Sequence, residues 1–147
     1  MKLFRFVALA TIFFSLYSCK SDESKKITSD PLMFSKTVKK LNDIVLENNF
    51  PPMIGSRNYV YASIAAYECI AAGDSSYQTL SGQIRHMPPM PKPEAGKKID
   101  YQLAAMLAFT KVGNAVTFPE GSMMGYYKDL VKKVDDASIP GDVLDNT

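Results

Sequence analysis

Hydrophobic residues recur every three or four positions along residues 31–48, which predicts an amphipathic helix. Lysines and acidic residues occupy the opposite side of this segment. Asp30 or Ser29 can cap the first turn, and Pro31 suits the first helical position, so the helix should begin there. The predicted apolar stripe consists of Phe34, Val38, Leu41, Ile44 and Val45.

A second apolar helix is predicted after the proline pair Pro51-Pro52. The prolines should block any helix before them, Ser56 can cap a new helix, and Gly73 can end it. Apolar residues at helical spacing indicate one wide face, which we expect to pack into the domain. That face consists of Val60, Ile64, Tyr67 and Ala71.

Two charged residues of this second helix are placed against the helix dipole. Arg57 lies in the first turn and Glu68 near the last turn. A helix N-terminus favours acidic side chains and a C-terminus favours basic ones. We therefore expect each to have a partner elsewhere; the alternative is a charge that faces a ligand.

A third helix, from Ile99 or Asp100 to Ala115, contains the unbroken apolar run of residues 103–109. Such a helix should be buried on all sides and central to the domain. Thr117, with Glu120 three residues later, predicts a capping box that starts a fourth helix ending near residue 136. The apolar face of the fourth helix consists of Met123, Tyr127, Leu130 and Val134.

A long connection, residues 73–98, joins the second and third helices. Its four prolines exclude helix from most of it, and one helical turn is expected near residues 77–80. We expect it to pack over the helices through Tyr77, Leu80, Ile84, Met87 and Met90. The alternative is that the proline run binds an aromatic groove on another protein. Because no alternating strand pattern occurs, the predicted fold class is all-α.

The first 18 residues are typical of a secretory signal peptide, with Lys2 and Arg5 followed by an apolar run too short to span a membrane. Leu16-Tyr17-Ser18-Cys19 resembles a bacterial lipobox, so Cys19 is predicted to carry the lipid anchor. The alternative is an ordinary signal peptide with an incidental cysteine.

Residues 19–30 form a predicted polar tether ahead of the domain. An acidic pair, Asp22-Glu23, follows Cys19 closely and resembles a surface-export signal of Bacteroidetes lipoproteins; a plain tether is the alternative. The predicted location is the cell envelope, lipid-anchored at the outer membrane, with surface exposure as the further prediction.

Composition fits a globular chain and gives no sign of a nucleic-acid partner. Of 147 residues, 46% are hydrophobic, which argues against disorder. The net charge of +2 comes from Lys2 and Arg5; the rest of the chain carries 15 basic and 15 acidic residues. A nucleic-acid surface needs an excess of basic residues on one face.

No residue pattern indicates a catalytic site or a metal site. His86 is the only histidine and has no neighbouring nucleophile or further metal ligands. Glycines occur singly rather than in a phosphate loop, and the pairs Asp22-Glu23 and Asp135-Asp136 are expected to be solvated. Cys69, in the second helix, is expected to act as a small buried hydrophobe rather than a reactive thiol.

The order of several segments resembles the vanadium-dependent haloperoxidase-like lipoproteins of Bacteroidetes, in the type 2 phosphatidic acid phosphatase superfamily. The resemblance covers residues 31–146. The segments that carry it are Pro-Pro-Met-Ile-Gly-Ser-Arg-Asn-Tyr-Val-Tyr-Ala-Ser-Ile-Ala-Ala-Tyr-Glu (51–68), Tyr-Gln-Thr-Leu-Ser-Gly-Gln (77–83), Pro-Met-Pro-Lys-Pro (89–93) and residues 103–118.

The resemblance implies an all-α bundle whose complete form holds vanadate or phosphate. The family site resembles Lys and Arg-Pro, then Pro-Ser-Gly-His, then Ser-Arg and His, in its C-terminal half. Here residues 80–83 are Leu-Ser-Gly-Gln and no Arg-Pro occurs, so no catalytic residue is carried over.

The implied role is the N-terminal scaffold of such an enzyme, inactive alone, with the missing C-terminal half of the domain as partner. The complete protein would oxidise halide with peroxide or hydrolyse phosphate monoesters. This interpretation predicts more apolar helix surface than residues 31–147 can bury themselves. The alternative is a small stand-alone helical lipoprotein that binds a partner or ligand at the cell envelope.

Overall fold

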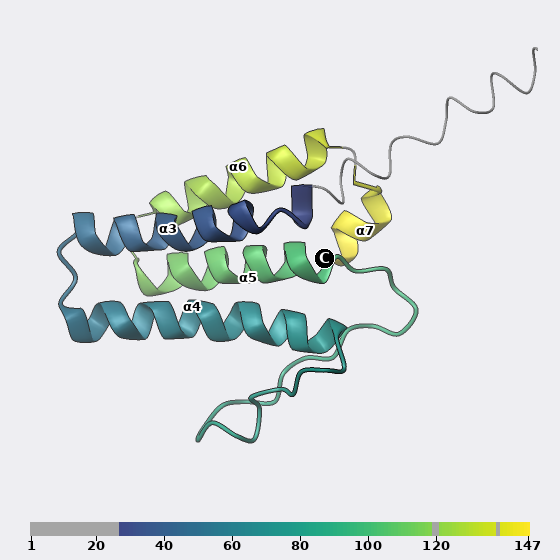
Figure 1. Ribbon diagram of the computed structural model, residues 1–147, viewed down its shortest axis with the longest axis horizontal. Coiled ribbons are helices and arrows are strands. Elements are labelled where there is room, and N and C mark those ends of the chain that lie inside the picture. Colours follow the sequence, from purple (N-terminus) through teal and green to yellow (C-terminus); the bar gives the residue numbers. More distant parts are fainter. Residues whose placement is uncertain (1–26, 119–120, 138) are drawn as a thin grey trace, which may run out of the picture.

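The computed structural model describes residues 27–118, 121–137 and 139–147, and its regular elements are all α-helices. They are α3 (Pro31–Glu47), α4 (Pro52–Gly73), α5 (Tyr101–Val116), α6 (Ser122–Asp136) and the short α7 (Gly141–Asn146). The predicted all-α class is confirmed. Helices α3, α4, α5 and α6 run side by side, and α7 lies beyond the start of α5 (Figure 1).

Helix α5 is central, as predicted, because it contacts α3, α4 and α6. One core cluster joins all four long helices around Leu41, Ile44 and Phe109, and the second lies around Leu103, Met106 and Val134. Burial of residues 103–109 is nevertheless incomplete, since Ala104, Leu107 and Ala108 are only half-buried.

Helix α4 forms one edge of the bundle, with α5 on its inner side (Figure 1). It begins at Pro52 rather than at Ser56, because proline lacks the N–H group that is unpaired in a first helical turn anyway. The Ser56 hydroxyl donates to the Met53 carbonyl at 3.0 Å instead of capping the helix. The predicted end at Gly73 is confirmed.

The inward face of α4 is not the one predicted from the sequence. The buried residues of this face are Gly55, Asn58, Ala62 and Ala66, whereas Val60 is 52% exposed. Small side chains let the backbones of α4 and its neighbours approach closely. At Gly55, an added Cβ atom would lie 3.0 Å from a Val45 methyl group. The larger apolar residues of α4, such as Val60, therefore lie outside the face that packs against the other helices.

Helix α3 is rotated slightly from its predicted orientation. Met33 and Thr37 are buried with Leu41, Ile44 and Val45, while Phe34 and Val38 remain 39% and 37% exposed. Phe34 still packs edge-on against Phe109, with ring centroids 5.8 Å apart. Thr37 can be buried because its hydroxyl donates to the Met33 carbonyl at 2.9 Å.

Helix α6 starts later than predicted, with Gly121 at its N-cap in the left-handed conformation. Thr117 instead caps the C-terminus of α5 and donates its hydroxyl to the Gly113 carbonyl at 2.8 Å. Glu120 lies outside the described residues. The predicted inward face of α6 is confirmed for Met123, Leu130 and Val134, and Tyr127 is half-buried.

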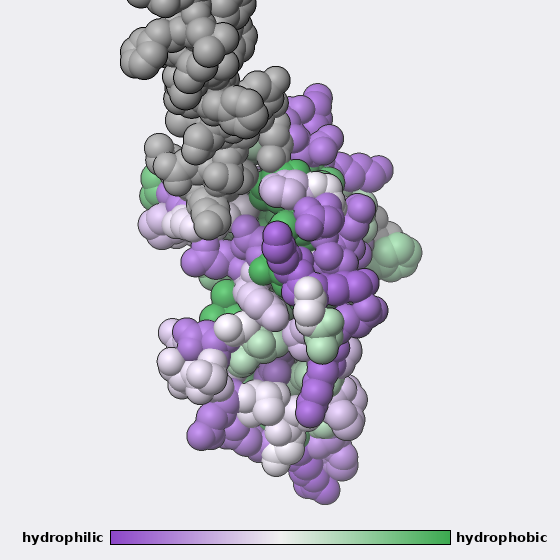
Figure 2. Space-filling view, turned by 90° about the vertical axis from the view of Figure 1, so that its right-hand side faces the viewer, coloured by the Kyte–Doolittle hydropathy of each residue, from purple (hydrophilic) through white to green (hydrophobic). Residues whose placement is uncertain are grey.

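Packing extends into the end of the segment predicted as a tether. The side chain of Ile27 packs against the cluster around Leu103 and Val134, and Thr28 is buried. The signal peptide, Cys19 and Asp22-Glu23 lie outside the described residues. Figure 2 shows the end of the molecule that carries α7, where polar residues dominate and hydrophobic residues form only small patches.

Candidate functional site

The connection between α4 and α5, residues 74–100, is called the strap here. It leaves the C-terminal end of α4, projects from the bundle and returns to the start of α5 (Figure 1). Its turns lie at residues 75–76, 81–86 and 95–96 rather than at 77–80. Leu80 and Met87 are half-buried, while Tyr77, Ile84 and Met90 remain 49%, 39% and 37% exposed, so the predicted packing of the strap over the helices is only partial.

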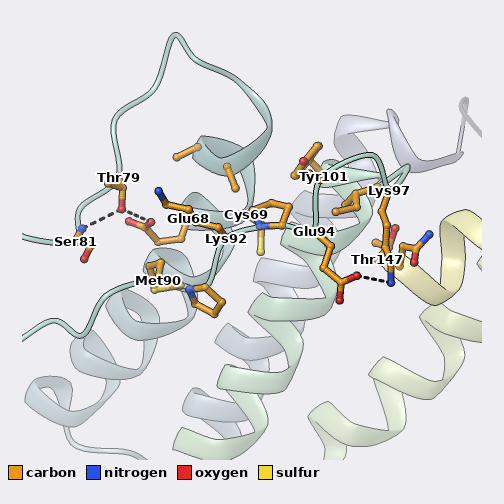
Figure 3. A pocket seen from close by; sticks show the side chains of 18 of the residues that line it. Glu68, Cys69, Thr79, Ser81, Met90, Lys92, Glu94, Lys97, Tyr101 and Thr147 are labelled. Atoms are coloured by element: carbon orange, nitrogen blue, oxygen red, sulfur yellow. Dashed lines mark hydrogen bonds and ion pairs between the residues drawn. The ribbon is translucent and has the colours of Figure 1, made fainter.

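A cavity of about 920 Å³ lies beneath the returning part of the strap. Its floor is formed by the last turns of α4 and the first turn of α5, and the end of the chain after α7 closes one side (Figure 3). Most of the lining is apolar. The apolar and small residues include Ala71, Ala72, Pro89, Met90, Pro91, Pro93, Ile99 and Ala104.

Glu68 anchors the outgoing part of the strap to α4. Its side chain is buried, with 4% exposed, and one carboxylate oxygen accepts the Thr79 hydroxyl at 2.6 Å. The other oxygen accepts the Leu80 backbone N–H, also at 2.6 Å. This confirms the predicted partner for Glu68. Because both oxygens accept hydrogen bonds from the strap, Glu68 holds the strap against α4.

Two further contacts hold the same part of the strap. The Tyr67 hydroxyl donates to the Gln78 carbonyl at 2.9 Å, and the Tyr67 ring packs edge-on against Tyr77 at 6.2 Å between centroids.

At the end of α4, the ring of Tyr101 occupies the space that a Cβ atom on Gly73 would take. The glycine therefore allows α5 to begin close against α4.

Two lysines on the returning part of the strap, Lys92 and Lys97, line the cavity. Lys97 pairs with Glu94 at 2.9 Å between the amine and carboxylate. Lys92 lines the cavity and makes no ion pair within residues 27–118, 121–137 and 139–147. Its ammonium group is therefore the uncommitted charge of the cavity lining.

Cys69 lines the cavity from α4 and also packs against the core cluster around Phe109. Burial raises the pKa of the Cys69 thiol, and the neighbouring Glu68 carboxylate raises it further. The thiol is therefore protonated at neutral pH and unreactive compared with an exposed cysteine. Cys69 acts as part of an apolar wall, in line with the role expected from the sequence.

Arg57 and His86 lie away from the cavity lining. The Arg57 guanidinium donates to the Tyr61 hydroxyl at 3.3 Å and lies over the same ring, so its partner is on α4 itself rather than elsewhere as expected. His86 is exposed in a strap turn with a positive φ of 66°. Asp135 and Asp136 are exposed at the end of α6.

The described residues do not fit the vanadate or phosphate that the resemblance implies for the complete family. An oxyanion needs several converging cationic or N–H donors. The cavity offers Lys92 and a Lys97 that is already paired with Glu94, which is too few donors to surround a multiply charged oxyanion. Within the same described ranges, no three His, Cys, Asp or Glu side chains group closely enough to hold a metal ion.

A second surface is the outer face of α4, which points away from α5. Helical periodicity places Met53, Ile54, Val60, Tyr61, Ile64, Tyr67, Glu68 and Ala71 on this side. The strap covers its C-terminal half through Tyr67 and Glu68. Its N-terminal half remains exposed, with Met53 at 81%, Ile54 at 44% and Tyr61 at 45%.

No helix in the part of the chain that the structure describes is long and apolar enough to cross a membrane. Comparisons with known protein families, with curated proteins and with solved structures found no significant match to this chain.

Proposed function

We propose that this domain is the N-terminal scaffold of a vanadium-dependent haloperoxidase- or acid phosphatase-like lipoprotein. Further helices of the same domain would cover the exposed half of the outer face of α4. Oxidation of halide by peroxide, or hydrolysis of phosphate monoesters, would belong to the whole protein. Vanadate or phosphate would be held by segments other than those described.

The observation that carries this proposal is the exposed half of the outer face of α4. Met53, Ile54, Val60 and Tyr61 are 81%, 44%, 52% and 45% exposed on this side of α4, and Arg57, which lies among them at helical spacing, is the one charged residue of the group. Exposed contiguous apolar patches on soluble proteins commonly mark interaction sites. The order of segments that resembles the haloperoxidase-like lipoproteins supplies the identity of the partner helices.

The proposal includes an anchor at the cell envelope. A lipid on Cys19 would hold the protein at the outer membrane, and the tether would separate the helical domain from the lipid surface. Metabolic labelling of the full chain with a radioactive fatty acid, in a bacterial host that processes lipoproteins, tests this part. Label should be incorporated by the natural chain and lost on Cys19→Ser substitution.

The scaffold role is tested with the full chain in a dye-binding and sedimentation experiment. The natural chain should bind 8-anilinonaphthalene-1-sulfonate and self-associate, and Val60→Lys should reduce both. Ser63→Lys is the matched control, because it adds the same charge to an exposed position beside the outer face.

Halide oxidation by the same chain, assayed with added vanadate, should show no turnover. Turnover, or a dye-free monomer, would overturn the scaffold role.

A second candidate function is a stand-alone lipoprotein that binds a ligand at the envelope. The cavity beneath the strap favours it, since ligand sites are commonly apolar cavities with a few polar groups. This alternative predicts a monodisperse monomer with a cooperative thermal transition and no affinity for the dye.

A further inference from the structure

The cavity beneath the strap has the size and lining of a small-molecule site. Its volume of about 920 Å³ lies within the range of ligand pockets, of the order of 300–1,000 Å³. Helix α4 contributes Ala71 and Ala72, α5 contributes Ala104, and the strap contributes prolines and Met90. These small or apolar groups offer no hydrogen bonds through their side chains. Thr79, Ser81 and Thr147 also line the cavity, but this floor of small and apolar groups favours an apolar main body in a ligand.

The charges of the lining set the polarity of the ligand's end group. The Glu68 carboxylate is buried, with 4% exposed, and its two oxygens accept the Thr79 hydroxyl and the Leu80 N–H at 2.6 Å each, so it presents little surface to a ligand. Glu94 is paired with Lys97. Lys92 remains, and Figure 3 shows it reaching from the strap into the region of Glu68 and Cys69. An uncommitted ammonium group beside an apolar cavity favours an anion.

We propose that this cavity binds an anionic amphiphile with one linear apolar chain, such as a medium-chain fatty acid. The chain lies against Ala71, Ala72 and Ala104, and the carboxylate pairs with the ammonium group of Lys92. This assignment does not depend on the scaffold role, which concerns the exposed half of the outer face of α4.

Cys69 offers an independent report on occupancy. The thiol lies in the cavity lining between the buried Glu68 and the apolar floor. A bound chain that fills the cavity should shield it from alkylation. Because protection is read at one residue, it distinguishes this cavity from apolar surfaces elsewhere on the chain.

The test is calorimetric titration of the full chain with dodecanoate below its micelle concentration. One equivalent should bind, and dodecanol and dodecyltrimethylammonium should bind at least fivefold more weakly. Lys92→Ala should weaken dodecanoate about five- to tenfold, because a charge-assisted bond is lost at a partly open site, and should leave dodecanol unchanged. Lys36→Ala, which changes an exposed lysine on α3, is the matched control and should alter neither affinity.

Two further measurements separate the cavity from other binding surfaces. Ala72→Trp should fill the cavity and abolish binding of both dodecanoate and dodecanol. Dodecanoate should slow alkylation of Cys69, read by peptide mass spectrometry, in the natural chain only. The proposal is overturned if dodecanoate does not bind, if Lys92→Ala and Lys36→Ala behave alike, or if Ala72→Trp binds normally. Binding to phosphatidylglycerol vesicles without binding of free dodecanoate would also overturn it, because it would indicate a membrane surface.

Discussion

The two halves of the outer face of α4 share one apolar stripe but differ in their surroundings. The C-terminal half lies under the strap, held by the bonds of Glu68 and Tyr67. The N-terminal half, from Met53 to Tyr61, has no covering element among the described residues. The difference shows what covering such a stripe requires: a buried polar anchor as well as apolar contact, because the covering segment brings its own backbone N–H groups.

The largest expected effect comes from removing the Glu68 carboxylate, which holds the strap over the covered half. Glu68→Ala should lower the free energy of unfolding by about 2–3 kcal/mol, because it leaves the Leu80 N–H and the Thr79 hydroxyl without their acceptor. Chemical denaturation of the full chain measures this loss. Glu68→Gln, which keeps one carbonyl acceptor, is the control and should lose less. An Ala variant as stable as the natural chain would mean that the strap is not anchored there.

A smaller effect is expected from the second strap contact. Tyr67→Phe removes only the hydroxyl that donates to the Gln78 carbonyl and keeps the ring packing against Tyr77. Because this bond is exposed, the loss should be about 0.5–1 kcal/mol. The same denaturation experiment measures it, and faster amide exchange should be confined to the strap. Faster exchange throughout the bundle would contradict a local role.

Shortening a side chain in the exposed half should lower the free energy of unfolding by less still. Val60→Ala should change the free energy of unfolding by less than about 0.5 kcal/mol, because Val60 is half exposed and alanine favours a helix more than valine does. Denaturation at low protein concentration, where association is minimal, gives the value. A loss of 1 kcal/mol or more would show that Val60 is already packed against something in the isolated chain.

The smallest expected effect is on the pKa of the Cys69 thiol, next to Glu68. Burial and then the Glu68 charge raise its pKa, so Glu68→Gln should lower that pKa slightly without restoring the ordinary value. Iodoacetamide alkylation at Cys69 across a pH series measures the change. Since the neutral thiol is favoured in the folded state, its contribution to stability is present below the ordinary thiol pKa and falls as pH rises through the raised one. An unchanged pKa in Glu68→Gln would mean that burial alone raises it.

The sequence predicted the four long helices well, because their apolar spacing and the Asp30 cap are local signals. It also predicted that Glu68 needs a partner, from its position against the helix dipole. It did not predict which side of α4 packs inward. Both sides are apolar, and the choice depends on close approach at Gly55 and Ala62, which is a property of neighbouring helices.

Two further errors come from residues whose hydroxyls have more than one use. Thr117 can cap a following helix or donate to a carbonyl of the preceding one, and here it does the latter. Ser56 likewise bonds within α4. The cavity could not be predicted at all, because the path of the strap depends on contacts between segments far apart in sequence. The lipid anchor and the family resemblance stay predictions.

The central claim, that other helices cover the exposed half of the outer face of α4, is tested most directly by thiol labelling inside cells. Val60→Cys in the protein as its native host produces it should react slowly with a membrane-permeant maleimide, while the same position in the purified 147-residue chain reacts rapidly. Lys36→Cys, at an exposed site on α3, calibrates reagent access in both settings. Protection at position 60 in cells alone is the predicted result, and equal, rapid labelling in both settings would contradict the account.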